Sequence, residues 1–316
     1  MAEACFRAIF AGPQVTVQDG GRRGMMRFGV PASGAMDRKA LAIANVALGN
    51  PATAPCIEVS RGGLTLDCLS GRVTLAVAGG GFILDIGGTR GGSWAVFTMA
   101  EGRQLTIRPG PWGSWTYLAF AGQIDAPAWL GSRSTHAQSG LGGRRIVTGQ
   151  DIRIGNTATR DDRAGNIPCP VWARPGQQLH AVPGPQDRFF APQTMQVLAT
   201  SVYHLTDACD RMGVRLKGPD LTPLAALGIP SQAIVRGSVQ VAGDGVPTVL
   251  MSDHQTTGGY PKIATVLADD IDRFAQLRPH DAIRFRMVSA DDAVRIARQR
   301  LLAFGRYLET LAKRHA

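Results

Sequence analysis

The densest group of reactive side chains in this sequence lies in one short run, residues 252–262 (SDHQTTGGYPK). The run directly follows the apolar strand pattern of residues 246–251 (VPTVLM). Polar groups collected where a strand ends are typical of binding sites. The two threonines and two glycines would let backbone N–H groups approach an anion, while Lys262 supplies a compact positive charge. A polar hairpin turn held by threonine hydroxyls is the alternative interpretation.

Two adjacent Asp-Arg pairs form the second group of candidates. One pair is Asp37 with Arg38, and the other is Asp210 with Arg211. The second pair is followed by a glycine and by Arg215, so a tight backbone would lie near two guanidinium groups suited to a carboxylate. In the structural alternative, each aspartate caps a helix or pairs locally.

Four short landmarks recur in the same order in the two halves of the sequence. They are 11–14 with 183–186, 33–38 with 206–211, 61–62 with 236–237, and 73–77 with 248–251. The offset between partners stays between 172 and 175 residues, which is hard to obtain except by duplication. We therefore expect each copy to be one structural unit.

Comparing the two copies favours a functional site in the second one. The stretch that matches the polar run is residues 78–82 (AGGGF), which carries almost no reactive groups. An active site need survive in only one copy. Glu58 and Gln240 fall near one another when the copies are overlaid, which makes them an ionisable and a neutral counterpart. A buried hydrogen-bonding role and a catalytic role both remain open for this pair.

The composition predicts a mainly β protein with two domains. The 316 residues include 39 glycines and 19 prolines, which disfavours long helices. Alternating apolar and polar residues predict strands, which include 71–78, 104–108 and 282–286. Helices are expected over 36–48 and from about residue 290, where an apolar stripe would dock on its own domain or bind a partner. Two domains of ordinary size follow, over 1–172 and 178–316, joined by a segment rich in proline and glycine.

Several function classes are disfavoured by what the sequence lacks. The five cysteines form no CxxC pair and the six histidines stand at no metal-ligand spacing, so we expect no disulfide framework and no metal site. Neither an export signal nor a membrane span is recognised, which predicts a cytoplasmic protein. The sequence has neither a phosphate loop nor a nucleophile elbow. It also has no lysine between two methionines, so the chain is not expected to carry biotin itself.

The net charge of +10 comes from arginine far more than from lysine. The arginines are scattered, and no nucleic-acid-binding signature accompanies them, so no nucleic-acid partner is expected. Arginine pairs in a planar, bidentate way with carboxylates and phosphates. A small anionic substrate or an acidic protein partner therefore explains the excess.

Five longer motifs are spread along the sequence: 17–22 (VQDGGR), 29–38 (GVPASGAMDR), 130–135 (LGSRST), 210–216 (DRMGVRL) and 255–263 (QTTGGYPKI). They closely resemble the allophanate hydrolase subunit 2 family, which includes biotin-dependent carboxyltransferases. The motifs fall in the family's order and cover nearly the whole chain. The resemblance implies two tandem cyclophilin-like β-barrels with a few short helices and a C-terminal helix. It also implies an obligate partner, the family's subunit 1, with which the active site would be shared.

The activity that this resemblance favours is that of an ATP-dependent 5-oxoprolinase, an amide-bond hydrolase that works only as an assembly. ATP with Mg²⁺ at the shared site would phosphorylate the lactam carbonyl of 5-oxoproline before the ring opens to glutamate. The implied catalytic groups are Asp210, Asp253, Lys262, Tyr260 and Gln240. The implied substrate-binding groups are Arg211, Arg215, Thr256, Thr257, Gly258, Gly259, Asp37, Arg38 and Glu58.

Two alternatives stay open at this stage. The same pocket would suit the carboxyltransferase component of a urea-type carboxylase, with biotin present only as a carrier on another protein. A non-catalytic protein that sequesters a kinase inhibitor is the third interpretation, although such a protein has no need of the polar run at 252–262. The partner, rather than this chain, would decide between the substrates.

Overall fold

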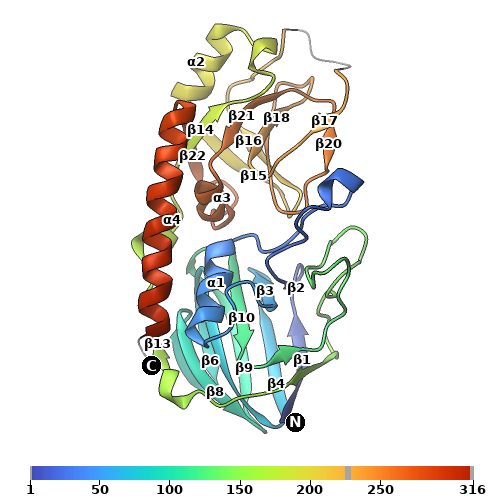
Figure 1. The fold of residues 1–316 in the computed structure, drawn as a ribbon, viewed down its shortest axis with the longest axis vertical. Coiled ribbons are helices and arrows are strands. Elements are labelled where there is room, and N and C mark those ends of the chain that lie inside the picture. The colour runs from blue at the N-terminus through green and yellow to red at the C-terminus, as the bar shows by residue number, and fades with distance from the viewer. Residues whose placement is uncertain (1, 225–228, 314–316) are drawn as a thin grey trace. The chain divides into compact units, whose positions relative to one another are not determined.

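The computed structural model describes residues 2–224 and 229–313 and is mainly β, as the sequence predicts (Figure 1). Within these residues there are four α-helices: α1 (Arg38–Ala47), α2 (Pro192–Thr200), α3 (Ala268–Ala275) and α4 (Ala290–Lys313). Short 3-10 helices occur at Met26–Phe28, Asp161–Arg163, Val171–Ala173 and Asp187–Phe189. The strands form two open sheets, one closed barrel and one two-stranded sheet.

The chain divides into two compact units by its internal contacts. The first unit contains residues 1–22, 33–174 and 305–316, and the second contains residues 23–32 and 175–304. A segment of the N-terminal half, Arg23–Ala32, thus belongs with the second unit, and the last part of α4 belongs with the first. The independent domains over 1–172 and 178–316 remain a prediction.

The first unit consists of two antiparallel sheets. The larger sheet has the order β11 (Gln123–Ile124), β12 (Asp151–Gly155), β1 (Glu3–Ala11), β4 (Leu64–Ser70), β9 (Gln104–Trp112), β6 (Gly81–Ile86) and β7 (Thr89–Gly92). The smaller has the order β13 (Gly165–Asn166), β8 (Ala95–Ala100), β5 (Arg72–Ala78), β10 (Trp115–Phe120), β3 (Cys56–Ser60) and β2 (Thr16–Gln18). Helix α1 packs on β5 and β10, and its buried alanines, Leu41 and Ile43 allow a close approach to these strands.

The second unit is a closed barrel of seven strands. Around the barrel lie β14 (Gln178–Pro183), β21 (Lys262–Val266), β18 (Ser238–Val241), β19 (Pro247–Leu250), β16 (Gly213–Lys217), β15 (Tyr203–Cys209) and β22 (Ala282–Met287). A parallel pairing of β14 with β22 closes the ring. The short strands β17 (Gln232–Ala233) and β20 (Thr257–Gly258) form a separate antiparallel pair. Closure satisfies the edge hydrogen bonds, so the barrel gives fixed positions to the side chains that it carries.

The predicted strands and helices are largely confirmed. Strands over 71–78, 104–108 and 282–286 correspond to β5, β9 and β22, and the two expected helices are α1 and α4. At the start of α4 the Ser289 hydroxyl accepts the Asp292 N–H at 3.1 Å, which caps the helix. Helices α2 and α3 were not predicted, since nine and eight residues are too few for a clear helical period.

The apolar stripe expected along α4 is only partly buried. Leu311 is 4% exposed, whereas Val294 and Leu301 are 49% and 69% exposed. The prediction that the whole stripe docks on its own domain is therefore wrong at Val294 and Leu301, whose side chains remain exposed.

The second landmark of the duplication precedes different elements in the two units. Asp37 caps α1 by accepting the Ala40 N–H at 2.9 Å, whereas Asp210 accepts the N–H groups of Met212 and Gly213 in the turn between β15 and β16. The aspartate has the same local task in both units, which is to satisfy free backbone donors. A helix follows in the first unit and a strand in the second.

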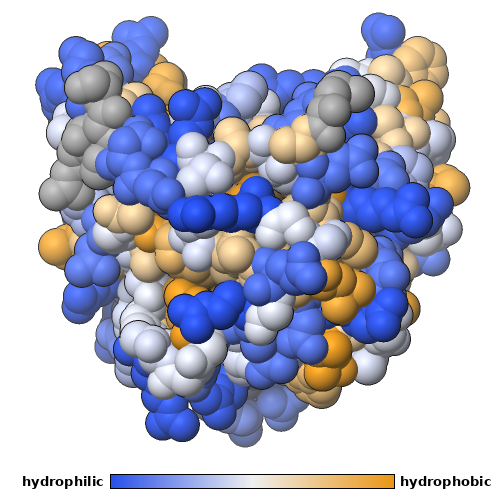
Figure 2. Space-filling view, turned by 90° about the horizontal axis from the view of Figure 1, so that it is seen from below, coloured by the Kyte–Doolittle hydropathy of each residue, from blue (hydrophilic) through white to orange (hydrophobic). Residues whose placement is uncertain are grey.

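The surface drawn in Figure 2 is mixed, with hydrophilic side chains separating small hydrophobic groups. The helices that the structure describes include none that is both long enough and apolar enough to cross a membrane.

A buried carboxylate organises the loops of the first unit. Asp19 is 9% exposed, and its Oδ1 accepts hydrogen bonds from the hydroxyls of Ser132 and Ser134 and from the Gly21 N–H. Its Oδ2 accepts the Arg133 N–H at 2.6 Å. Two of the family motifs, 17–22 and 130–135, thus meet in one polar network. Charge-assisted hydrogen bonds of this kind are the strong ones.

We expect Asp19→Ala to destabilise the protein by at least about 3 kcal/mol, because it leaves several buried donors without their acceptor. Chemical denaturation monitored by circular dichroism measures this loss. Asp151→Ala is the matched control, since it removes an exposed carboxylate that pairs with Arg7. Equal stability losses in the two variants would contradict the network's importance.

Candidate functional site

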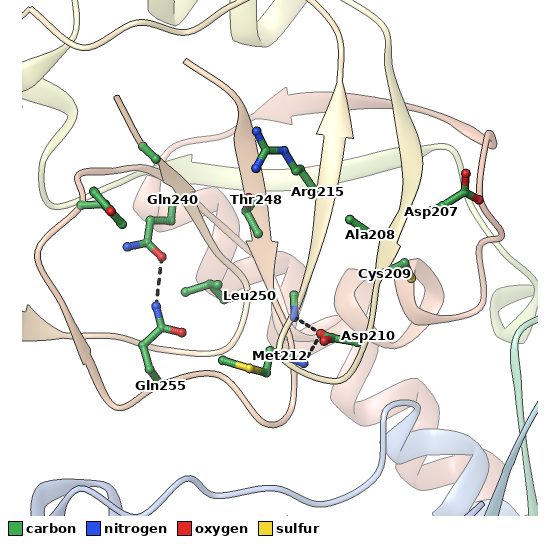
Figure 3. Close-up of a pocket in the computed structure, with 13 residues that line it drawn as sticks. Asp207, Ala208, Cys209, Asp210, Met212, Arg215, Gln240, Thr248, Leu250 and Gln255 are labelled. Carbon is green, nitrogen blue, oxygen red and sulfur yellow. Dashed lines mark hydrogen bonds between the residues drawn. The ribbon is translucent and has the colours of Figure 1, made fainter. Parts of the chain in front are cut away.

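A cavity of about 550 Å³ opens within the second unit, beside strands β16, β18 and β19 (Figure 3). Such a volume suits a small organic molecule. Its lining mixes carboxylate, guanidinium, carboxamide and phenol groups with small apolar side chains. The lining residues are Asp207, Ala208, Cys209, Asp210, Met212, Gly213, Arg215, Gln240, Ala242, Thr248, Leu250, Gln255 and Tyr260.

Two glutamines face one another on one side of this cavity (Figure 3). The Gln255 carboxamide donates from Nε2 to Gln240 Oε1 at 3.2 Å. Gln240 is 6% exposed, and its own Nε2 has no hydrogen-bond partner within residues 2–224 and 229–313. Its orientation is fixed through the oxygen, so the amide nitrogen is a buried donor in the wall of the cavity.

Lys262 lies next to Gln240 on the neighbouring strand. The two residues are register partners of β18 and β21, at a bulge that interrupts the regular alternation between Val239 and Gln240. Gln240 lines the cavity, whereas Lys262 is not among its lining residues. Lys262 is 1% exposed, and its Nζ finds no hydrogen-bond partner in the described part of the chain. Burial lowers the pKa of Lys262 below its ordinary value.

The backbone around Lys262 is held firmly. Its N–H donates to Gln186 Oε1 at 3.1 Å, and the other end of the Gln186 carboxamide donates to Gln232. Gly184 packs so closely on the Lys262 carbonyl that a Cβ at position 184 would collide with it. Two nitrogen donors, Gln240 Nε2 in the cavity wall and Lys262 Nζ on the adjoining strand, thus lack an acceptor in the described part of the chain. Such a pair suits an oxygen of a bound carbonyl or carboxylate.

Arg211 and Asp253 form a buried, bidentate ion pair rather than lining the cavity. Arg211 Nε and Nη2 donate to the two carboxylate oxygens at 2.9 and 3.0 Å, and both side chains are at most 2% exposed. The Asp253 N–H also donates to the Arg211 carbonyl at 2.7 Å. The pair therefore fixes the start of the polar run against the turn at Asp210, which is a positioning role.

Asp210, Arg215 and Tyr260 line the cavity, as expected of residues that contact a ligand. The Asp210 carboxylate is held by two backbone N–H groups of the following turn. Arg215 is exposed and pairs with Asp244 at the surface. Tyr260 is 48% exposed, so its hydroxyl is accessible to a ligand or to another protein.

The Thr-Thr-Gly-Gly segment forms the approach to the glutamines. Thr257 and Gly258 make up β20 and pair with β17, and the Thr256 carbonyl accepts the Ile234 N–H. A Cβ at Gly258 would lie 2.7 Å from Ile234 Cδ1 and 3.3 Å from Gln240 Nε2, so a side chain there would displace the end of the Ile234 side chain. A Cβ added at Gly259 would lie 3.1 Å from the Ile229 carbonyl oxygen. Anion binding by the backbone of this segment stays a prediction.

The three candidates in the first unit have structural partners there. Asp37 is the N-cap of α1, and Arg38 is the first residue of that helix. Glu58 is completely buried on β3, where its Oε2 accepts the Met36 N–H and the Tyr117 hydroxyl, both at 2.8 Å. Burial, followed by the charge of Glu58, raises the pKa of Tyr117.

Two important glutamines were not singled out in the sequence. Gln255 was part of the polar run but was passed over beside its charged neighbours, and Gln186 appeared only as the end of a repeat landmark. The glutamine that follows Gly-Pro in both copies could have pointed to Gln186. Its contact with Lys262 joins residues 76 positions apart, which the sequence alone does not show.

No group of three or more His, Cys, Asp or Glu residues that would hold a metal ion occurs among residues 2–224 and 229–313.

This chain belongs to the family described as the carboxyltransferase domain, subdomain A and B, which matches residues 28–287. More particularly, it is 36% identical over 312 residues to the C subunit of 5-oxoprolinase from Escherichia coli strain K12, covering 98% of both chains. It is 32% identical to the Haemophilus influenzae protein of the same name, over 90% of this chain and 92% of that protein. Urea amidolyase of Lachancea kluyveri is 28% identical, but only 18% of its length is matched. The family resemblance found in the motifs is confirmed.

Solved structures agree with this assignment. TTHA0988 is 30% identical with a TM-score of 0.80, and the match covers 90% of this chain and 55% of that chain. The chain thus spans about half the length of TTHA0988. The urea carboxylase of Kluyveromyces lactis matches 97% of this chain and 29% of its own length with a TM-score of 0.86. At 24% identity it supports the fold alone.

We expect Asp253→Ala to destabilise the protein by about 3–5 kcal/mol, because it removes the carboxylate that compensates the buried Arg211 guanidinium. Equilibrium unfolding in urea measures the change. Asp244→Ala removes the exposed partner of Arg215 instead and should have a far smaller effect. An Asp253→Ala protein as stable as the natural one would contradict the positioning role.

Lys262→Met should stabilise the protein at neutral pH by about 1–3 kcal/mol, since it removes an unsatisfied buried donor. With the pKa of Lys262 lowered in the folded state, the unfolded chain binds more protons between the two pKa values. Stability of the natural protein should therefore rise with pH through that window, and the variant should lack this rise.

Thermal unfolding between about pH 7 and pH 10 tests this expectation, because the ordinary lysine pKa lies just above that range. Lys217→Met on the exposed face of β16 is the control. A less stable Lys262→Met variant, or one that keeps the same pH dependence as the natural protein, would show that the ammonium is well accommodated.

Proposed function

We propose that this chain is one component of an ATP-dependent 5-oxoprolinase. The observation that carries the proposal is the 36% identity to the C subunit of the Escherichia coli 5-oxoprolinase over 98% of both chains. The match to the Haemophilus influenzae protein supports it over almost the same length. The substrate is then a small lactam with a carboxylate, which agrees with a compact cavity that holds an unsatisfied donor.

In this proposal the cavity of the second unit binds the lactam. Gln240 Nε2 in the cavity wall donates to the lactam carbonyl oxygen, and the Lys262 ammonium on the adjoining strand favours negative charge on that oxygen during activation. Arg215 exchanges its surface partner Asp244 for the substrate carboxylate. Asp210 and Tyr260 then face the ring and act as general acid or base toward it. Arg211 and Asp253 hold this arrangement in place.

The proposal includes a partner of the allophanate hydrolase subunit 1 type and a cytoplasmic location. ATP with Mg²⁺ binds at a site shared with that partner. Phosphoryl transfer from ATP to the carbonyl oxygen gives ADP and an activated lactam, and water then opens the ring to glutamate with release of phosphate.

The carboxyltransferase alternative keeps one specific support. The family description names a carboxyltransferase domain, and a putative urea carboxylase of Emericella nidulans is 27% identical over 95% of this chain. In that case the same two donors would hold the carbonyl of a urea-like acceptor, and biotin would arrive on another protein.

The deciding experiment is ATP hydrolysis by the chain purified together with its partner protein. We expect 5-oxoproline to stimulate hydrolysis, and we expect Gln240→Ala to reduce the stimulation about tenfold or more through loss of a transition-state contact. Gln193→Ala on the exposed surface of α2 is the matched control.

Lack of stimulation by 5-oxoproline, together with urea-dependent transfer from carboxybiotin, would replace the proposal with the alternative. Capture of a kinase inhibitor without any turnover would indicate the non-catalytic protein.

A further inference from the structure

A second cavity, of about 630 Å³, lies within the first unit and has no place in the function proposed above. Its walls come from the loop after α1, the turn between β10 and β11, strand β11, the loop that carries Arg133 and the loop after β12. Two arginines, Arg133 and Arg160, line it together with polar groups such as Gln123 and Asn156, and no carboxylate is among its lining residues. The cavity is therefore positively charged.

The acidic neighbour of Arg160 is engaged elsewhere. Asp161 accepts hydrogen bonds from Arg72 at 2.8 Å and from the Thr98 hydroxyl at 2.6 Å. The Arg160 guanidinium has no hydrogen-bond or ion-pair partner among the described residues. Its charge is thus available to a ligand.

Arg133 is held in position from both its backbone and its side chain. The residues on either side of it, Ser132 and Ser134, donate to Asp19, which also accepts the Arg133 N–H. The Arg133 Nε donates to the Ala126 carbonyl at 3.0 Å, which fixes the plane of the guanidinium. Both Nη atoms remain without partners in the described chain.

The same loop is also pinned on its other side. Gly143 packs on the Arg133 carbonyl and Gly142 on the Ser134 carbonyl so closely that a Cβ at either glycine would collide. The contacts between the motifs 17–22 and 130–135 therefore hold Arg133 in a fixed position at the cavity. Preorganisation of this kind lowers the entropy lost on binding.

We propose that this cavity binds a small organic molecule through an oxyanion group, a carboxylate or a phosphate, that Arg133 and Arg160 clamp together. Two guanidinium groups in a lining that contains no carboxylate match the charge of such a group, while Glu3 and Asp125 line the adjoining hollow that Arg133 also borders. Pro51, Pro55 and Ile124 add apolar surface for the rest of the molecule. The site shares no residue with the cavity of the second unit.

Isothermal titration of the full chain with AMP, inorganic phosphate and L-glutamate tests the proposal. We expect saturable binding of at least one probe, weakened about tenfold or more by Arg133→Met and by Arg160→Met. Arg90→Met, an exposed arginine of β7 in the same unit, should leave the affinity unchanged. Preference for AMP over glutamate would identify a phosphate, and the reverse a carboxylate.

Thermal unfolding midpoints of the three variants confirm that each is folded before titration. Binding that is unchanged in both Arg133→Met and Arg160→Met, or lost only in Gln240→Ala, would place the ligand elsewhere and overturn the proposal. No saturable binding of any probe at millimolar concentration would overturn it as well. Neither outcome bears on 5-oxoproline-stimulated ATP hydrolysis, so the two proposals fail separately.

Discussion

The second unit contains a lysine side chain that is taken out of water without an acceptor among the described residues, which opposes folding. Lys262 Nζ and the amide nitrogen of its cross-strand neighbour Gln240 both lack partners in the described chain, and each such group opposes folding. The barrel tolerates this because β21 is fixed by Gln186 and by closure of the ring. Strain of this kind is retained where a ligand relieves it.

The first unit shows what the same position becomes when its hydrogen bonds are satisfied. Glu58, the proposed counterpart of Gln240, is equally buried, but its cross-strand neighbour Tyr117 and the backbone before α1 donate to it. Its carboxylate therefore stabilises the fold. The same position of the repeat thus holds a fully hydrogen-bonded Glu58 in the first unit and, in the second unit, Gln240 with an amide nitrogen that has no acceptor in the described chain. This difference supports placing the lactam site in the second unit.

Much of the fold followed from the sequence, but only part of the site did. Glycine-rich composition and period-two alternation predicted β5, β9 and β22, and the helices expected over 36–48 and from about residue 290 correspond to α1 and α4. The polar run was identified because its chemistry is local. Gln186 was missed because its contact with Lys262 is created by barrel closure, and Arg211 was taken for a ligand-binding group because burial is invisible in a motif. Residue types predict chemistry, whereas tertiary contacts decide which groups remain free.

The most direct test of this account is a ¹³C NMR titration of the lysine Cε resonances. The chain contains only four lysines, so Lys262 is assigned by the signal that disappears in Lys262→Met. The account predicts that this one signal titrates at a clearly lower pH than ordinary lysine, and that a bound lactam changes its midpoint. A Lys262 signal that titrates normally and does not respond to 5-oxoproline would contradict the central claim.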